Sequence, residues 1–236
     1  MQGGTDEIDT RSVFTRYASL CPRMGKNYMY LEQTLQHYLD DLASAQPTPG
    51  GGSASALSGA MGAALASMVC RLTLGKAGYE QAQAEVEDIL EQTEQLRARF
   101  QQLLEEDIAA YGRLSACYKM PRETDEERAA RTAAIQKQLV EAALVPLEMV
   151  QCAAKLTQYC VRIAEIGNAN VLSDIATATA LATSAAEGAS SMVNINLQAM
   201  KNAKLVDELG AQLKNALQLV RKGSQQVLMA IAWRRA

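Results

Sequence analysis

The spacing of apolar positions along this chain is helical from about residue 29 to the C-terminus. Ala, Leu, Gln, Glu, Lys and Arg dominate this part, and no segment sustains a period-two alternation of β-branched residues. The pattern therefore predicts an all-α fold without strands. We expect helices over residues 31–45, 53–74, 79–118, 125–166, 171–186, 191–197 and 201–235.

The longest of the early helices, residues 79–118, has an inner stripe at heptad spacing that includes Val86, Phe100 and Leu114. Residues 53–74 and 171–186 consist mainly of small side chains, which bury little area by themselves. These two helices need tight packing against the long helices or against a second subunit. The sequence thus predicts a bundle of long antiparallel helices.

Helix-breaking and helix-capping residues refine this prediction. Thr124 or Asp125 can cap the helix that ends near Ile166, and Pro146 inside it predicts a kink. Gly188 predicts a break before residues 191–197.

Residues 1–28 differ in character from the rest of the chain, since they are mixed and polar and include Gly3, Gly4, Pro22 and Gly25. We predict a poorly ordered N-terminal extension over residues 1–28. The remaining residues, 29–236, are enough for one helical domain with a substantial core.

The charge pattern argues against nucleic acid as a partner, because the net charge is -3 and the Lys and Arg residues are scattered among acids. Residues 53–70 carry no charge, but they are mostly Ala, Gly and Ser, so close helix packing explains them better than a membrane span. Five cysteines without a CxxC pair predict reduced thiols, and residues 1–28 lack the apolar run of a signal peptide. We expect a cytoplasmic protein.

The most informative segment is the glycine run that follows Pro47 and precedes the helix at residues 53–74. Pro49 keeps the chain extended, Gly50, Gly51 and Gly52 let a ligand approach the backbone, and Ser53 can cap the helix. The free N–H groups of a helix N-terminus favour a carboxylate, a phosphate or an electron-rich heterocycle. A turn without any ligand is the alternative for such a segment taken alone.

Two carboxylates occupy positions where an ionised side chain is unexpected. Asp107 falls in the inner stripe of residues 79–118, where burial would raise its pKa and make it a candidate general acid and base. Asp174 is the only charge between Ile166 and Ala186. The structural alternative for Asp107 is pairing with an Arg or with a helix terminus, and that for Asp174 is a helix-dipole contact.

Several polar residues could complete a binding site. Asn168 and Asn170 flank a turn and could read the edge of a heterocycle, although Asn is equally a common turn residue. At least one of Asn194 and Asn196 should make a specific hydrogen bond, because both lie in an apolar stretch. Lys76, in a glycine-flanked turn, could meet an anionic tail.

Other chemistries lack their signatures. The single histidine, His37, stands among polar residues, so we expect neither a His-based triad nor a metal site. The glycine run lacks the Lys-Ser/Thr ending of a P-loop and no strand precedes it.

Four motifs in this order resemble the cyclodeaminase/cyclohydrolase family. They are Pro47-Thr-Pro-Gly-Gly-Gly-Ser53, Gly59-Ala-Met-Gly-Ala-Ala-Leu65, Asp107-Ile-Ala-Ala-Tyr111 and Gly167-Asn-Ala-Asn-Val-Leu-Ser-Asp174. The resemblance covers roughly residues 31–235 and implies a dimeric all-α protein, a homodimer or larger, that acts on tetrahydrofolate derivatives. The segment from Ile175 to Ala180 departs from the family's usual Val-Ala-Ala.

The resemblance also implies roles for individual residues. Asp107 matches the catalytic carboxylate, the Gly50–Ser53 segment matches the substrate loop, and Asn168, Ser173 and Asp174 match a second motif of the site. We expect Asp107 to move protons, Asp174 to orient N10 or stabilise the cationic intermediate, and Lys76 to hold a glutamyl tail.

The first expected function is that of a formiminotetrahydrofolate cyclodeaminase, a step in the use of histidine-derived formimino groups. Methenyltetrahydrofolate cyclohydrolase is the alternative, because both reactions pass through an aminal-like tetrahedral carbon and need the same proton carrier. A helical interaction protein without activity is a third hypothesis from another class. The expected partner is a reduced folate, with or without a polyglutamate tail, as substrate and not as a tightly bound cofactor.

Overall fold

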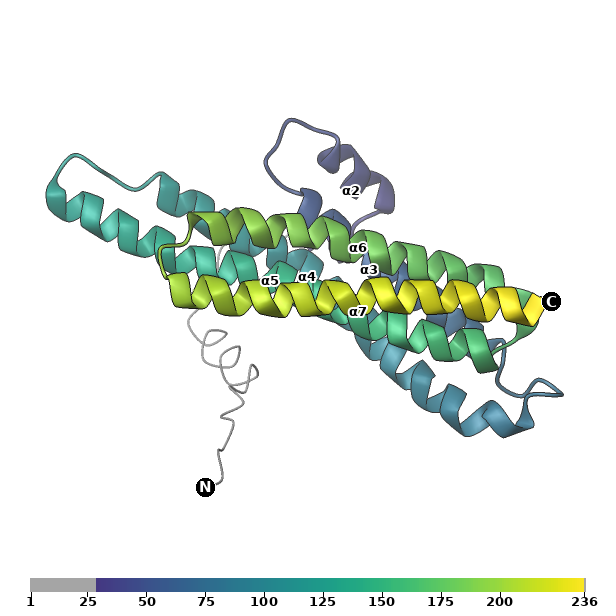
Figure 1. The fold of residues 1–236 in the computed structure, drawn as a ribbon. Coiled ribbons are helices and arrows are strands. Elements are labelled where there is room, and N and C mark those ends of the chain that lie inside the picture. The colour runs from purple at the N-terminus through teal and green to yellow at the C-terminus, as the bar shows by residue number, and fades with distance from the viewer. Residues whose placement is uncertain (1–28, 236) are drawn as a thin grey trace, which may run out of the picture.

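Five long helices lie side by side in a computed structural model that describes residues 29–235 (Figure 1). No strand occurs among these residues, so the predicted all-α fold is confirmed. The helices are η1 (Tyr30–Glu32), α2 (Leu35–Leu42), α3 (Gly51–Arg71), η2 (Glu80–Ala82), α4 (Gln83–Tyr118), α5 (Asp125–Ile166), η3 (Ala169–Val171), α6 (Leu172–Ala199) and α7 (Ala203–Arg235). The predicted extension, residues 1–28, lies outside the described residues.

The inner stripe predicted for α4 is buried as expected. Val86, Phe100 and Leu103 are fully enclosed, and Phe100 is among the largest buried side chains of the core. On the outer side, Arg99 donates two hydrogen bonds to Glu148 of α5 at 2.6 and 2.8 Å. Apolar burial and these charged pairs together align α4 with α5.

Small residues bring α3 into very close contact with α4 and α6. A Cβ at Gly59 would overlap the ring of Phe100, and one at Gly62 would lie 2.9 Å from the carbonyl oxygen of Ala178. The same holds for Gly188, where a Cβ would overlap the hydroxyl of Ser55. The predicted break at Gly188 is wrong, because this glycine serves close packing within one continuous helix, α6.

Helix ends are only partly as predicted. Thr124 caps α5 and exchanges hydrogen bonds with Glu127, and the helix continues through Pro146. Ser53 was expected to be the N-cap of α3, but Gly50 holds that position and Ser53 is the third residue of the helix. The hydroxyl of Ser53 instead reaches back to Gly50, from whose N–H it accepts and to whose carbonyl it donates.

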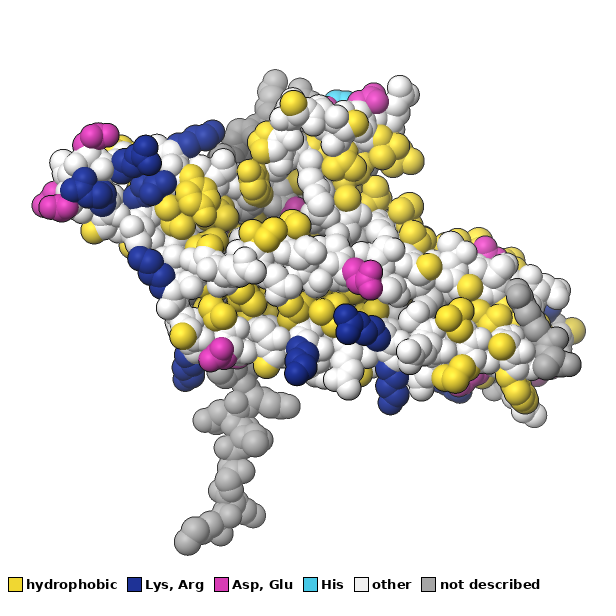
Figure 2. All heavy atoms as spheres, turned by 45° about the horizontal axis from the view of Figure 1, so that its top comes forward, with side chains coloured by type: hydrophobic (Ala, Val, Ile, Leu, Met, Phe, Trp, Pro, Cys, Tyr) yellow, Lys and Arg dark blue, Asp and Glu magenta, His cyan; other side chains and the backbone are white. Residues whose placement is uncertain are grey.

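The short helix α2 stands away from the bundle (Figure 1) and is anchored by the buried side chain of Tyr38. Just before α2, the backbone N–H of Leu31 donates to Glu105 of α4 at 3.1 Å. Leu31, Leu35 and Leu39 are exposed, and Figure 2 shows hydrophobic side chains gathered on this arm. Exposed apolar side chains on an arm outside the bundle are typical of a contact surface.

Helix α3 is the one described helix that is long and apolar enough to cross a membrane by length and composition. This is weak evidence for a membrane span, because core helices pass the same test and 61% of its apolar window is buried in the bundle. The cysteines outside residues 1–28 are free thiols, and Cys70, Cys152 and Cys160 are buried.

Candidate active site

The glycine run and Asp107 lie in the walls of one cavity of about 160 Å³. The segment from Pro47 to Gly52 forms one wall, just before and at the start of α3. The other walls come from three helices, with Asp107, Ala110, Tyr111 and Leu114 from α4, Ala142 from α5, and Met192 and Asn196 from α6. The sequence thus predicted two of the elements that meet here.

Asp107 has an unusual protonation equilibrium for a carboxylic acid. Burial raises its pKa from 3.8 to about 6, while a hydrogen bond from the backbone of Ser53 acts in the opposite direction. No ion pair of Asp107 occurs within residues 29–235, so pairing with an Arg finds no support there. The other structural alternative, contact with a helix terminus, does occur, because the Ser53 backbone in the first turn of α3 donates to Asp107. A carboxyl with a pKa near neutrality can accept and return a proton at physiological pH.

Gly52 is the residue that allows Asp107 to occupy this place. A Cβ on Gly52 would overlap the carboxylate of Asp107, whereas a Cβ on Gly51 would lie 3.8 Å from the methyl group of Met192, an ordinary contact. The two glycines therefore differ: Gly52 makes room for the acid, and Gly51 faces the α6 wall.

A hydrogen-bonded network behind the glycine run holds its conformation. The hydroxyl of Ser53 accepts from Gly50 N–H at 3.1 Å and donates to the Gly50 carbonyl at 2.9 Å. Since its proton is committed, the 3.2 Å contact with the hydroxyl of Tyr38 has Tyr38 as the donor. The arm that carries Tyr38 is thereby linked through Ser53 to Asp107.

These bonds leave two amide groups free to meet a ligand. The N–H of Gly50 serves Ser53, and that of Ser53 serves Asp107. Gly51 and Gly52 open the first turn of α3, and their N–H groups have no hydrogen-bond partner among the described residues. A helix N-terminus of this kind attracts an anion or an electron-rich group.

The second group of predicted site residues lies at the other end of the bundle. Asp174 and Asn196 are 22 positions apart in the continuous helix α6, which separates them by about 33 Å at 1.5 Å per residue. Ser173 adjoins Asp174, and Lys76 follows the opposite end of α3 from the glycine run. One chain alone therefore does not bring these residues to Asp107.

Asn168 and Asn170 have structural contacts at that far end. The side chain of Asn168 donates to the carbonyl of Leu72 at 2.9 Å, and its backbone N–H donates to the hydroxyl of Thr73 at 3.0 Å. The N–H of Asn170 donates to the Asn168 side chain at 3.1 Å. These bonds fasten the turn before α6 to the end of α3.

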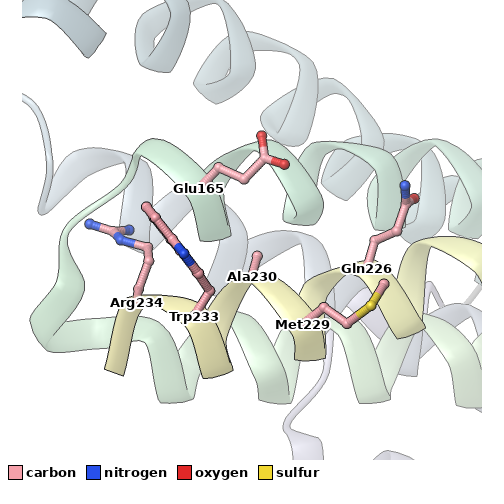
Figure 3. A pocket seen from close by; sticks show the side chains of 6 residues that line it. All are labelled: Glu165, Gln226, Met229, Ala230, Trp233 and Arg234. Atoms are coloured by element: carbon pink, nitrogen blue, oxygen red, sulfur yellow. The ribbon is translucent and has the colours of Figure 1, made fainter. Parts of the chain in front are cut away.

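A larger hollow of about 410 Å³ lies between the ends of α5 and α7, where Figure 3 shows the exposed ring of Trp233 near Arg234 and Glu165. Glu165 is paired with Arg162, and Arg234 donates to the carbonyls of Ala164 and Gly167. Its charged groups are thus occupied within the chain, and it contains none of the predicted site residues.

Sequence reasoning missed residues that line the Asp107 cavity, among them Tyr111, Ala142 and Met192, and it missed Tyr38, which supports the glycine run through Ser53. A signal existed for Tyr111, which lies one helical turn after Asp107 and so shares its face. At least one of Asn194 and Asn196 was expected to make a specific hydrogen bond, and Asn196 makes two, to Ala142 and Met192. Tyr38 gave no comparable signal, since its role depends on how the α2 arm folds back.

The family model of formiminotransferase-cyclodeaminase matches residues 34–215, which include both the glycine run and Asp107. The chain belongs to this family. The predicted resemblance is thereby confirmed, and the match takes in the far-end group with Asp174 as well.

Individual members of the cyclodeaminase family are similar over most of the chain. It is 39% identical over 185 residues to the methenyltetrahydrofolate cyclohydrolase of Methylorubrum extorquens, covering 78% of this chain and 89% of that protein. It is 28% identical over 216 residues to the formimidoyltransferase-cyclodeaminase of Rattus norvegicus, of which it spans only 40%.

A solved family structure has the same fold. The crystal structure of formiminotetrahydrofolate cyclodeaminase from Thermotoga maritima superposes with a TM-score of 0.78 at 29% sequence identity, covering 86% of this chain and 97% of that chain. The helical bundle described above is therefore the fold of this cyclodeaminase family.

Proposed function

We propose that this protein is a folate one-carbon enzyme, a formiminotetrahydrofolate cyclodeaminase. It would convert 5-formiminotetrahydrofolate into 5,10-methenyltetrahydrofolate and ammonia. The observation that carries the proposal is Asp107, a carboxyl with a pKa of about 6 in the wall of a cavity that Gly51 and Gly52 also line.

Asp107 can serve the proton transfers of this reaction. The N10 amine attacks the formimino carbon, a new N10–C bond forms, and ionised Asp107 takes the proton that N10 releases. Protonated Asp107 then gives this proton to the imino nitrogen, which becomes the amino group of a tetrahedral intermediate. Asp107 passes a second proton, taken from solvent, to this amino group, and its bond to carbon breaks to release ammonia and the methenyl cation. Asp107 thus ends each turnover ionised as it began.

The backbone amides of Gly51 and Gly52 supply the positioning that the transfer requires. Both lie at the N-terminus of α3, where the helix dipole attracts a carbonyl or a carboxylate of the ligand. The side chain of Tyr111 lines the same cavity and offers an aromatic face to a flat ring. The pterin ring of a reduced folate has both features, a carbonyl group and a planar surface.

Methenyltetrahydrofolate cyclohydrolase is the second candidate, favoured by the 39% identity to the Methylorubrum extorquens protein of that name. In this reaction Asp107 would take a proton from water as its oxygen attacks the methenyl carbon. It would give this proton to N5 as the bond between N5 and the carbon breaks, and the remaining hydroxyl proton would pass to solvent as the formyl group of 10-formyltetrahydrofolate forms. The same carboxyl and cavity serve, because both reactions pass through a tetrahedral carbon between N5 and N10.

A second copy of the chain completes the proposal. The outer side of α3 carries a charge-free apolar stripe with exposed or half-buried side chains, formed by Leu57, Met61, Ala64, Leu65, Met68 and Leu72. Its middle lies near Ala64, so a two-fold axis at that point would pack two α3 helices in opposite directions. Each glycine run would then lie near the partner's Lys76 and Asp174.

This homodimer would reunite the two groups of predicted site residues, which one chain keeps about 33 Å apart. Lys76 would meet the glutamyl tail of a folate bound in the partner's cavity, and Asp174 would orient N10 or stabilise the cationic intermediate there. A cytoplasmic location is part of the proposal and is supported by free thiols at Cys70, Cys117, Cys152 and Cys160. We also propose a role in using formimino groups that derive from histidine.

The test follows two substrates in parallel. Purified protein is incubated with 5-formiminotetrahydrofolate and, separately, with 5,10-methenyltetrahydrofolate, while methenyl absorbance and ammonia are measured against enzyme-free controls. Appearance of the methenyl chromophore from 5-formiminotetrahydrofolate, together with a stoichiometric amount of ammonia, would establish the cyclodeaminase. Loss of chromophore above the spontaneous rate, without ammonia from the formimino compound, would establish the cyclohydrolase, and no reaction with either would leave the interaction protein as the better hypothesis.

A further inference from the structure

We infer that Asn196 orients the substrate, with its Oδ1 atom accepting a hydrogen bond from an N–H group of the bound folate derivative. The inference rests on the proposed function, since it concerns the same cavity. Asn196 lies in α6, on a different wall from Asp107 and close to Ala142 of α5.

The orientation of the Asn196 amide is fixed by its own contacts. Its Nδ2 atom donates to the carbonyl oxygen of Ala142 at 2.8 Å and to that of Met192 at 2.8 Å. A flipped amide would place Oδ1 against two carbonyl oxygens, so this rotamer has a single acceptable assignment. Both hydrogens of Nδ2 are therefore used within the protein.

Oδ1 remains as the polar atom that Asn196 can offer to the cavity. It has no hydrogen-bond partner among the described residues, although the side chain is only partly exposed and lines the cavity. A polar atom in such a place is normally satisfied by water or by a ligand. A ligand group that fits it must be a donor, because a carbonyl side-chain oxygen can only accept.

An uncharged acceptor opposite the acid suits this chemistry. Asp107 must lose and regain a proton during turnover, so it cannot hold one hydrogen-bonded geometry throughout. The amide of Asn196 keeps the same state at every pH at which the enzyme folds. It can hold an N–H of the substrate while Asp107 changes its protonation.

The N–H donor can come from two parts of the substrate. The tetrahydropterin ring carries several N–H groups, and the formimino group carries one more at the reacting carbon. A bond to the ring would fix the position of the whole ligand. A bond to the formimino group would hold the nitrogen that leaves as ammonia.

The test replaces Asn196 and leaves Asp107 unchanged. Asn196→Ser removes the amide oxygen but retains a hydroxyl that can donate to the Met192 carbonyl, as Thr177 and Thr183 of the same helix do four residues back. Asn196→Leu is the second variant, of similar shape and without polar atoms. We expect kcat/KM for 5-formiminotetrahydrofolate to fall about 10- to 100-fold in both.

Gln136→Leu is the matched control for the structural contribution of such a bond. Gln136 also links α5 to α6, since its Nε2 donates to the Ala199 carbonyl at 3.0 Å, but it does not line the cavity. We expect Gln136→Leu to change Tm while kcat/KM stays within about twofold. The midpoint of the pH profile, set by Asp107, should remain unchanged in the Asn196 variants.

The affinity of tetrahydrofolate, measured by calorimetry, separates the two sources of the N–H. Weaker binding in the Asn196 variants would place the bond on tetrahydrofolate itself, and unchanged binding with reduced kcat/KM would place it on the formimino group. The inference is overturned if either folded variant keeps kcat/KM and tetrahydrofolate affinity within twofold of the wild type. A wild-type protein that turns over neither substrate would instead refute the proposed function.

Discussion

The carboxylate of Asp107 rests against the backbone of Gly52, in the space that a Cβ at that position would occupy. This contact joins α4 to the first turn of α3 and explains why the acid can be desolvated without losing its place at the cavity. The glycine is required here for space, since its backbone conformation is helical and open to any residue. Function and packing therefore depend on the same pair.

We predict that Gly52→Ala will lower kcat/KM by about 100-fold or more, because the added methyl group displaces the Asp107 carboxylate. Gly51→Ala should remain within a few-fold of the wild type, since its Cβ would meet only the flexible end of Met192 at 3.8 Å. Steady-state kinetics on both variants, with Tm as the measure of folding, provide the test.

Gly112→Ala is the control for substitution of a helical glycine, because a Cβ there meets nothing within 4 Å. It should retain full activity and gain slightly in stability. Normal activity in Gly52→Ala would show that the position of Asp107 at this glycine is not needed for turnover.

Asp107→Asn should fold and bind tetrahydrofolate but turn over at least about 100-fold more slowly, since an amide cannot carry the proton. In the wild type, the pKa of about 6 predicts that kcat/KM rises with pH around that value, as the base form of Asp107 appears. Rates from pH 5 to 8, corrected for the enzyme-free reaction at each pH, provide the measurement. A flat profile with near wild-type turnover in Asp107→Asn would remove this residue from the mechanism.

The raised pKa of Asp107 also predicts how the stability of the protein changes with pH. Folding raises the pKa of Asp107 from 3.8 to about 6, so the stability that its protonated form provides is present below pH 4 and is lost as pH rises through 6. The difference corresponds to at most about 3 kcal/mol. Denaturation of Asp107→Asn and wild type at pH 4 and pH 8 should show the variant gaining relative stability at pH 8. If the difference in unfolding free energy between the variant and the wild type does not grow in the variant's favour from pH 4 to pH 8, Asp107 is not desolvated.

Much of the fold was predictable because it depends on local patterns. The stripe through Val86 and Phe100 located α4, and Thr124 located the start of α5, since periodicity and capping act within a few residues. The expected break at Gly188 was wrong for a reason that lies elsewhere in the chain, at Ser55. A glycine required by a distant helix looks the same in sequence as one that ends its own helix.

The candidate site was predictable to the same extent. Asp107 and the Gly50–Gly52 segment were found because both break a local rule, a charge in an apolar stripe and glycines before a helix. Their distance from Asp174 could not be predicted, because it follows from the continuity of α6. The contribution of Tyr38 depends on the tertiary position of α2, which no local pattern encodes.

Tyr38→Phe should test whether the α2 arm supports the site. Burial raises the pKa of Tyr38, and the nearby Asp107 carboxylate adds to this, so the hydroxyl stays protonated and donates to Ser53. We expect kcat/KM to fall about tenfold. Without the hydrogen bond from Tyr38, Ser53 is held less firmly, and so is its backbone N–H, which donates to Asp107.

The pH profile separates this effect from a general loss of stability. Weakening the Ser53 backbone bond should move the midpoint of the Tyr38→Phe profile upward, since that bond lowers the pKa of Asp107. Tyr30→Phe is the control, because the Tyr30 hydroxyl donates to Asp41 within the arm and does not reach Ser53. Equal midpoints in all three proteins would confine Tyr38 to a structural role.

The proposed dimer predicts a specific effect of a charge on α3. Met61 is 46% exposed within the apolar stripe, so Met61→Asp would bury one carboxylate from each chain in the apolar interface. We expect the variant to elute as a monomer and to lose most activity, because each cavity would lack the partner's Asp174 and Lys76. Met229→Asp, at the exposed α7 position of 63% exposure, should leave size and activity unchanged. A fully active monomer would show that Asp107 and the glycine run suffice without a second chain, and that the far-end residues serve only the fold.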